Sequence, residues 1–471
     1  MPVAGVRRPR PFNGRVMQMW AQVVTFTCMI GTFLLLVTLL KLPAALATAG
    51  AACVGLVASG NAGGLHHLVE GAFSYFDVLL VIAMAMVFMA ALESSGILEE
   101  ISTRITGRLG HRPLLLALAS MLLVMAPGML TGSSTAAAMT TGRFVLPVLV
   151  EAGISPARAG AFVALGSVLG MVAPPVNVPV MIIGSGIDMP YVGFDLPLLL
   201  LTVPAAVAVS VWVAAGARSD ARSDARSDAG LSAGPGAGGP AAGSGTGPGA
   251  GGDGSQPVNS HRRLRGVRVY VPIAALLVMM SAVRLSAGSI PDPGIPFMFA
   301  VGAVLAMLCG RRVKPWSIIV DGIGMAMPVM GVLCGAGMFV QVMTVTGVRG
   351  LLVTSALDIP RAWVFIVAAL ALPLFGAISA YASSSVMGVP ILLALLGNNE
   401  VVTAAALSML AAMGDLLPPI AIVPSLIAQS TGGGLASRSV LLGQVARPAI
   451  CVALWAFAVL RWAPAIGRLL Q

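Results

Sequence analysis

The chain alternates between long apolar stretches and short segments that hold most of its charged residues. Stretches close to the roughly 20 residues that a helix needs to cross a bilayer recur along the whole length. Examples are residues 21–40, 75–92, 196–214 and 441–460. A signal peptide would explain one such stretch near the N-terminus and none of the others. The pattern predicts an all-α polytopic membrane protein.

A polar segment divides the chain into two apolar halves. Residues 218–228 read RSDARSDARSD, and a run rich in Gly, Ala, Pro and Ser continues to about residue 258. Such a composition offers almost no apolar surface to bury, so we expect a disordered linker over residues 217–266.

The two halves resemble each other. In the first, Ser95-Gly96-Ile97 is followed by GMLTGSSTAAAMTTG (128–142) and GMVAPPVNVP (170–179); in the second, Thr346-Gly347-Val348 is followed by GAISAYASSSVMG (376–388) and GDLLPPIAIVP (414–424). Internal repeats are typical of secondary transporters. Five predicted crossings separate the equivalent segments, at 155–186, 192–214, 268–286, 293–310 and 316–345. Because five is odd, we expect the second repeat to be inverted.

These boundaries predict six regions. They are N-terminal scaffold helices (1–96), a first repeat (97–216), the linker (217–266), further scaffold helices (267–346), a second repeat (347–437) and a C-terminal helix (438–471).

Charge composition agrees with a membrane protein. Hydrophobic residues make up 58% of the chain and charged residues 9%, against about a quarter in soluble domains. The formal net charge of +10 comes from basic residues between apolar runs, which favours membrane topology over nucleic-acid binding. The five cysteines and four histidines show no metal-ligand spacing, so we expect no cofactor and no metal beyond a coupling cation.

Two proline pairs interrupt apolar runs. Pro174-Pro175 and Pro418-Pro419 each remove backbone donors, and the ring of each first proline clashes with the carbonyl four residues earlier, at Gly170 and Gly414. Freed carbonyls are tolerated in a bilayer only where they line a cavity or are buried in protein. We therefore predict two discontinuous helices and a cation site, at Gly170, Pro174, Gly414, Asp415 and Ser385. A single pair would instead favour a packing kink.

The small-residue segments predict two re-entrant hairpins with polar tips. Helix ends that meet at such tips offer N–H groups to a carboxylate, and hydroxyls suit a cation. The expected substrate ligands are Thr131, Gly132, Ser133, Ser134, Ser383, Ser384 and Asn177. Close packing of small residues, as in the Gly128-xxx-Gly132 spacing, is the alternative interpretation.

Asp415 is the acid that we place deep in the membrane, where an aspartate costs on the order of 2.5–3.5 kcal/mol. A bound cation would offset that cost. Asn177, just after the first proline pair, is the expected neutral counterpart of Asp415.

On these residues the chain resembles the large membrane (M) subunit of TRAP transporters, within the ion transporter superfamily. The best marks are Ser95-Gly96-Ile97, the segment from GSSTAAAMTTG (132–142) to EAGISPARA (151–159), and residues 170–175. The resemblance implies an elevator-type, Na⁺-coupled permease of a bacterial inner membrane. It also implies two partners, a small four-helix membrane subunit and a periplasmic substrate-binding protein. Asp415 departs from the family, which usually has a small residue or Asn there.

The expected function is cation-coupled uptake of a small organic anion such as a carboxylate. A stand-alone ion-coupled carrier of the same superfamily is the main alternative, and a passive channel is a third. An intramembrane hydrolase is disfavoured, because the chain has no GxSxG motif and every histidine lies in a predicted loop.

The short basic loops predict that the linker is cytoplasmic. They are formed by Arg104, Arg108 and Arg112, by Arg262, Arg263 and Arg265, and by Arg311, Arg312 and Lys314. A single cysteine placed in the linker of a cysteine-free variant should resist an impermeant thiol reagent added to intact cells. Labelling without permeabilisation would contradict this orientation.

Overall fold

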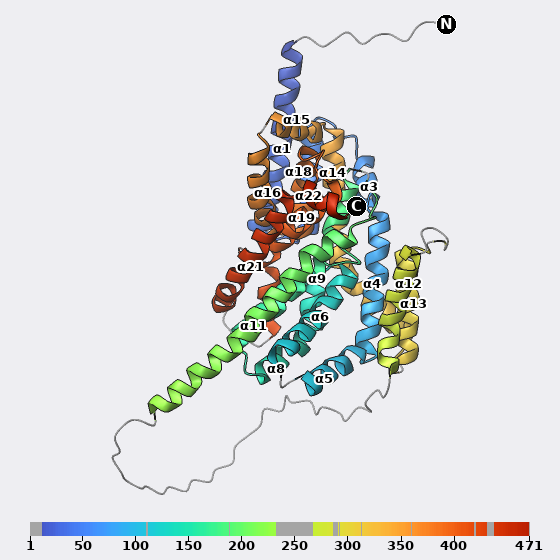
Figure 1. Ribbon diagram of the computed structural model, residues 1–471. Helices are drawn as coiled ribbons and strands as arrows, with labels where there is room; N and C mark the ends of the chain where they lie inside the picture. The colour runs from blue at the N-terminus through green and yellow to red at the C-terminus, as the bar shows by residue number, and fades with distance from the viewer. Residues whose placement is uncertain are drawn as a thin grey trace, which may run out of the picture.

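The structure is a computed structural model that describes residues 12–109, 112–187, 189–231, 267–285, 291, 293–311, 313–358, 360–418, 421–430 and 438–470. Within these ranges the chain is helical and forms no strand (Figure 1). Six helices are long and apolar enough to cross a membrane, namely Met17–Thr38, Phe76–Ser94, Pro113–Thr131, Asp195–Gly216, Pro315–Val345 and Ser439–Arg461. The predicted all-α polytopic architecture is confirmed.

One group of helices packs around α14 (Pro315–Val345), which contacts α2 (Ala44–Ala58), α3 (His66–Phe73) and α4 (Phe76–Ser94). The group is completed by α1 (Phe12–Thr38), which packs on α2, by α13 (Ile295–Cys309), which packs on α4, and by η1 (Val267–Tyr270) and α12 (Val271–Leu285). We call this group the scaffold.

The remaining helices form two series in the same order. The first is α5 (Ile97–Leu109), α6 (Pro113–Thr131), α7 (Ser134–Thr140), α8 (Gly142–Glu151), α9 (Pro156–Val172), α10 (Val178–Ser185) and α11 (Asp195–Leu231). The second is α15 (Val348–Asp358), α16 (Arg361–Gly376), α17 (Ala380–Ser383), the π-helical turn η2 (Ser384–Gly388), α18 (Val389–Ala394), α19 (Glu400–Met413), η3 (Gly414–Leu416), α20 (Ile422–Ser430) and α21 (Arg438–Arg461), followed by α22 (Ala463–Leu470).

The two series are inverted relative to each other. Their first helices, α5 and α15, lie at opposite ends of the molecule (Figure 1). Each begins after a glycine in the left-handed region, Gly96 with φ +73° and Gly347 with φ +76°. Glycine adopts this conformation without the penalty that other residues incur, so the same sharp entry is repeated in both halves.

Both predicted helix interruptions are present. Helix α9 ends at Val172, the chain is extended at Ala173, and α10 begins at Val178. In the second half α19 passes into the short 3₁₀ turn η3, and Leu417 is extended before α20. Pro419 lies outside the described residues. The proline pairs therefore end helices, as their missing N–H groups require.

Glycines bring the interrupted helices into backbone contact with their neighbours. A Cβ at Gly128 of α6 would lie 2.7 Å from the carbonyl carbon of Gly170, and a Cβ at Gly170 would lie 2.5 Å from the carbonyl oxygen of Met125. In the second half a Cβ at Gly414 would overlap the backbone of Gly376. The same helix contact is thus built from glycine in both repeats, as close packing of membrane helices favours.

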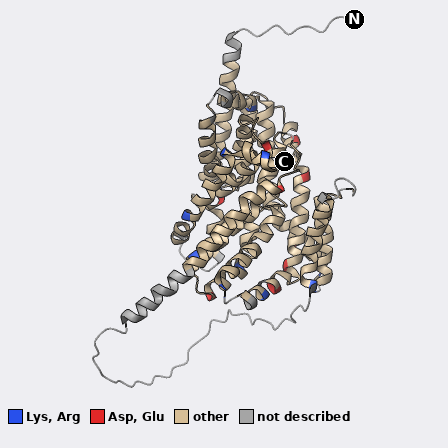
Figure 2. Cartoon of the chain, in the orientation of Figure 1, with Lys and Arg blue, Asp and Glu red and all other residues tan. Residues whose placement is uncertain are grey.

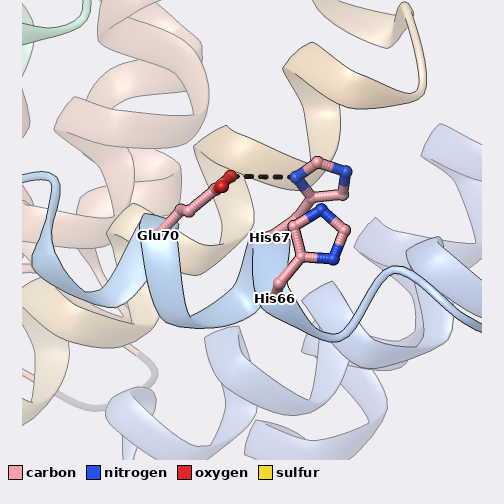
Figure 3. Close-up of side chains that lie close together, drawn as sticks. All are labelled: His66, His67 and Glu70. Atoms are coloured by element: carbon pink, nitrogen blue, oxygen red, sulfur yellow. Dashed lines mark hydrogen bonds and ion pairs between the residues drawn. The ribbon is translucent and has the colours of Figure 1, made fainter.

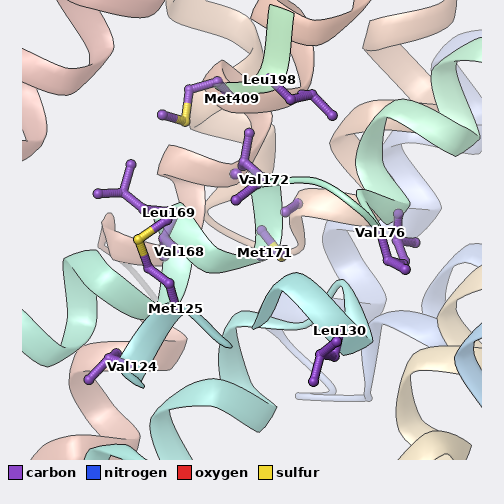
Figure 4. Close-up of a cluster of buried hydrophobic side chains, with 14 of the residues drawn as sticks. Val124, Met125, Leu130, Val168, Leu169, Met171, Val172, Val176, Leu198 and Met409 are labelled. Atoms are coloured by element: carbon purple, nitrogen blue, oxygen red, sulfur yellow. The ribbon is translucent and has the colours of Figure 1, made fainter. Parts of the chain in front are cut away.

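The core continues from these contacts into apolar packing. Figure 4 shows Val124 and Met125 of α6 beside Val168, Leu169 and other apolar residues of α9, with Leu198 of α11 and Met409 of α19 at the edge of the same cluster. These side chains are buried. The second repeat therefore completes the core of the first.

Charged residues are sparse and gather near helix ends (Figure 2). Around α5 they form ion pairs, between Arg104 and Glu100 at 3.0 Å, between Arg311 and Glu99 at 3.4 Å, and between Arg143 and Glu93. Glu93, which the sequence places near the end of a span, is therefore partnered across helices.

Helix α11 differs from the prediction at its C-terminal end, because it continues to Leu231 through most of the RSDARSDARSD segment. The disorder predicted from residue 217 is wrong for 217–231. Alanine and arginine favour helix, and the segment holds neither proline nor glycine before Gly230. The rest of the predicted linker, 232–266, lies outside the described residues.

The glycine contacts give a stability prediction. Gly128→Ala and Gly414→Ala should each destabilise the protein by about 1–3 kcal/mol, because the added methyl group forces two backbones apart. Gly443→Ala in α21 is the control, since a Cβ there meets nothing within 4 Å; it should be neutral or stabilising by up to about 1 kcal/mol. Thermal unfolding in detergent measures all three. Equal effects at the three sites would contradict the packing role.

Candidate functional site

Each repeat contains a helical hairpin, formed by α6 with α7 in the first and by α16 with α17 in the second. At the tip of each hairpin the second helix begins with a serine cap. The Ser133 hydroxyl accepts from the N–H of Ala136 at 3.3 Å at the start of α7, and the Ser379 hydroxyl accepts from the N–H of Ala382 at 3.4 Å at the start of α17. Serine is a favoured N-cap because its oxygen satisfies an N–H group that the helix leaves free. Equivalent residues of the two repeats therefore turn the chain at equivalent places.

Asp415 of η3 lies between these two tips. The Ser134 hydroxyl donates to its Oδ2 at 2.5 Å, and the backbone N–H of Ala380 also hydrogen bonds its carboxylate. Asp415 is only 5% exposed. Asp415 is thus buried within the protein, and groups from both repeats hold its carboxylate.

Two further hydrogen bonds join the repeats. The Tyr381 hydroxyl donates to the carbonyl of Gly132 at 2.8 Å, and the Asn177 amide donates to the Ser408 hydroxyl at 3.0 Å. Sequence reasoning missed both Tyr381 and Ser408. Tyr381 is the only aromatic residue of its hairpin tip, which could have singled it out, whereas nothing in the local sequence marks Ser408 of α19.

A cavity of about 300 Å³ lies beside Asp415. Its polar side chains, Ser134, Thr135, Ser379, Tyr381 and Asp415, all come from the hairpins and η3. The opposite wall belongs to the scaffold and is apolar, with Val37, Leu42, Pro43 and Ala44 from the α1–α2 region and Pro328, Val329 and Val332 from α14. Among the described residues of the lining, Asp415 is the only charged one, so the cavity combines a negative charge, hydroxyls and an apolar face.

The other predicted substrate ligands of the first repeat hydrogen bond to the backbone or cap a helix. Thr131 donates to the carbonyl of Pro127 at 2.7 Å, and Gly132 caps α6 in the left-handed region. Asn177 accepts from the N–H of Val180 at 3.0 Å as the N-cap of α10, and it does not line the cavity. It is therefore not brought to Asp415 as its counterpart.

In the second hairpin the hydroxyls point to backbone carbonyls. Ser383 donates to Leu372 at 2.7 Å, Ser384 to Ala380 at 2.8 Å and Ser385 to Ala382 at 3.4 Å. None of these serines lines the cavity. Ser134 is thus the predicted ligand serine whose hydroxyl reaches both Asp415 and the cavity.

The carbonyl groups that the prolines were predicted to free for a cation are hydrogen bonded within the chain. The Gly170 carbonyl accepts from the N–H of Ala173 at 3.2 Å, and the Gly414 carbonyl accepts from the N–H of Leu417 at 2.8 Å. Each break therefore tightens into a 3₁₀-type turn that pairs the carbonyl at its edge. Pro174 lies in the first break and does not line the cavity.

A second polar cluster lies away from this site, on α3. Figure 3 shows His67 directed at Glu70, with His66 beside it. The His67 Nδ1 lies 2.9 Å from Glu70 Oε2, which lowers the pKa of Glu70, and Gln341 of α14 donates to the same oxygen at 3.2 Å. Ligand atoms of the three residues lie within 4.8 Å of one another, but His66 and Glu70 are exposed and Glu70 already has two partners.

Comparison with protein families gives a match over nearly the whole chain. The model described as "Tripartite ATP-independent periplasmic transporter, DctM component" covers residues 19–466. The chain belongs to this family. It is thus a DctM-type protein, from a family described as components of tripartite transporters.

Among solved structures, this DctM protein is similar to the YdaH transporter of Alcanivorax borkumensis, whose crystal structure is described as having an unusual topology. The two share 15% sequence identity with a TM-score of 0.54, over 87% of this chain and 89% of the other. At this identity the likeness concerns the fold. No curated protein matches the sequence.

The hydroxyl geometry separates two serines that look alike in sequence. If Asp415 and Ser134 together hold a coupling cation, Ser134→Ala, which removes the 2.5 Å donor to Asp415, should raise the cation concentration needed for half-maximal uptake severalfold. Ser384→Ala is the control, because its hydroxyl bonds within its own hairpin, and it should leave that concentration unchanged. Uptake into proteoliposomes over a range of Na⁺ concentrations measures both. The same change in both variants would favour a packing role for these serines.

Proposed function

We propose that this DctM protein is the large membrane subunit of a cation-coupled uptake system for small organic anions, with Na⁺ as the coupling ion and C4-dicarboxylates as a candidate substrate class. It works in a bacterial inner membrane with a small four-helix membrane subunit and a periplasmic substrate-binding protein. The observation that carries the proposal is the cavity beside Asp415, which lies where both hairpins meet the scaffold.

The charge of the cavity supplies a physical reason for coupling. A carboxylate that enters next to the Asp415 carboxylate is repelled, and this repulsion is strong where apolar walls exclude water. A cation held by Asp415 and the Ser134 hydroxyl would replace that repulsion with attraction. The cation and the anion would then each raise the affinity for the other, which favours their transport together.

The backbone at the hairpin tips complements the anion. Helix ends that meet inside a transporter offer N–H groups and positive dipole ends to a substrate carboxylate. Here α7 and α17 both start at the cavity, after Ser133 and Ser379. We propose that the hairpins are re-entrant in the membrane and move with the bound ligands against the scaffold, as in an elevator.

A stand-alone carrier with the same coupling site is the second candidate. The YdaH transporter, whose fold is similar, is itself described as a transporter. Reconstitution of this DctM protein alone separates the two. Uptake without a binding protein would support the stand-alone carrier, and uptake that needs both partners would support the tripartite system.

Asp415→Asn tests the coupling site. The amide keeps the size and can still accept from Ser134, but it removes the charge, so the half-maximal Na⁺ concentration should rise at least about tenfold, which corresponds to about 1.4 kcal/mol. One cation fewer per cycle should also weaken the response to an imposed voltage, since each charge moved across 100 mV is worth about 2.3 kcal/mol.

Asp321→Asn on the exposed surface of α14 is the matched control and should change neither property. If H⁺ is the coupling ion, the Asn variant should lose the pH dependence of uptake instead. An Asp415→Asn protein with normal ion and voltage dependence would show that Asp415 is a structural acid.

A further inference from the structure

A second cavity, which we call the groove, lies between α11 and α21, away from the site at Asp415. It has a volume of about 440 Å³, and the described residues that line it all belong to these two helices. The helices run in opposite directions (Figure 1). The lining extends from Pro204 to Trp212 on α11 and from Arg447 to Trp455 on α21, roughly 12 Å along each helix at 1.5 Å per residue.

The antiparallel arrangement gives the cavity two different ends. Trp455 lies at the end near the start of α11, because its indole N–H donates to the carbonyl of Leu200 at 3.3 Å. Trp212 and Arg447 therefore lie at the other end, close to Gly216, where the apolar span of α11 stops. Between the two ends the lining is apolar apart from the thiol of Cys451.

Positive charge is concentrated at the end near Trp212. The Arg447 side chain is exposed, lines the cavity, and forms no ion pair with any residue in the described part of the chain. The Arg158 guanidinium lies 5.7 Å from the centre of the Trp212 ring, on the same side of the molecule. No acidic side chain lines the cavity.

We propose that this groove binds an anionic phospholipid, with the headgroup phosphate at Arg447 and Trp212 and an acyl chain along the apolar part toward Trp455. Tryptophan is enriched where headgroups meet hydrocarbon, and basic pockets between membrane helices bind anionic headgroups. A zwitterionic lipid also carries a phosphate, but its own ammonium group offsets that negative charge, so its net attraction to Arg447 is weaker. An apolar helix of another subunit would offer Arg447 no negative charge.

Cys451 makes occupancy measurable, because it is exposed and lines the groove. The experiment uses the purified full-length protein in detergent and follows alkylation of Cys451 by a maleimide. Cys53 of α2 is also exposed and serves as the internal reference. Phosphatidylglycerol should slow alkylation of Cys451 severalfold relative to Cys53, and phosphatidylcholine at the same concentration should have a much smaller effect.

Two variants test the role of the charge. Arg447→Gln should reduce the protection by phosphatidylglycerol to the level given by phosphatidylcholine. Arg461→Gln, at the far end of the same helix and outside the groove, should keep the wild-type selectivity. Because Arg447 is exposed, the Gln variant should fold, and an unchanged rate at Cys53 checks this.

Three outcomes would overturn the proposal. They are equal protection by both lipids, protection by inorganic phosphate alone, and protection that appears only when a partner membrane subunit is added. The first would make the groove unselective, the second would remove the role of the acyl chain, and the third would make the groove a protein interface.

Discussion

Each interrupted helix leaves backbone N–H and C=O groups that hydrocarbon cannot satisfy. The rest of the structure depends on how neighbouring segments hydrogen bond or cover these groups. The first break is closed by its own 3₁₀-type turn and by the hairpin beside it, where the N–H of Val176 donates to the carbonyl of Met129 at 3.2 Å. Glycine at the contact lets the helix backbones touch, so water and lipid are kept from the break. The hairpins and the contacts between the repeats both serve to satisfy or cover the backbone groups at the breaks.

The same requirement also ties the two halves of the chain together. Each half supplies polar groups that the other half satisfies, as the bonds of Ser134 to Asp415 and of Asn177 to Ser408 show. Buried polar groups without partners are costly, so each repeat depends on the other for its own interior.

Much of the fold could be predicted from sequence because its signals are local. Proline pairs end helices, and positive-φ glycines such as Gly96 and Gly347 recur at the same place in each repeat. The burial of Asp415 also followed from its apolar surroundings. The apolar spans and the helix breaks could therefore be predicted without information on tertiary contacts.

The composition of the site was harder to predict because it depends on side-chain direction and on segments far apart in the chain. Ser134 and Ser384 both lie in serine-rich tips, but only the first is directed at Asp415. Tyr381 spans the gap to Gly132, and the apolar wall comes from α1, α2 and α14. The helical propensity of the RSDARSD repeats was also underestimated, since alternating charge does not by itself break a helix.

The apolar wall of the cavity has a mechanical consequence. Hydrogen bonds are directional and fix two surfaces in one register, whereas dispersion contacts between smooth aliphatic surfaces are non-directional and are exchanged for similar ones when the surfaces shift. Val37, Pro328 and Val329 line the cavity on the scaffold side, and their side chains carry no hydrogen-bonding group. The elevator movement proposed above would therefore break no side-chain hydrogen bond between the polar half of the site and these three residues.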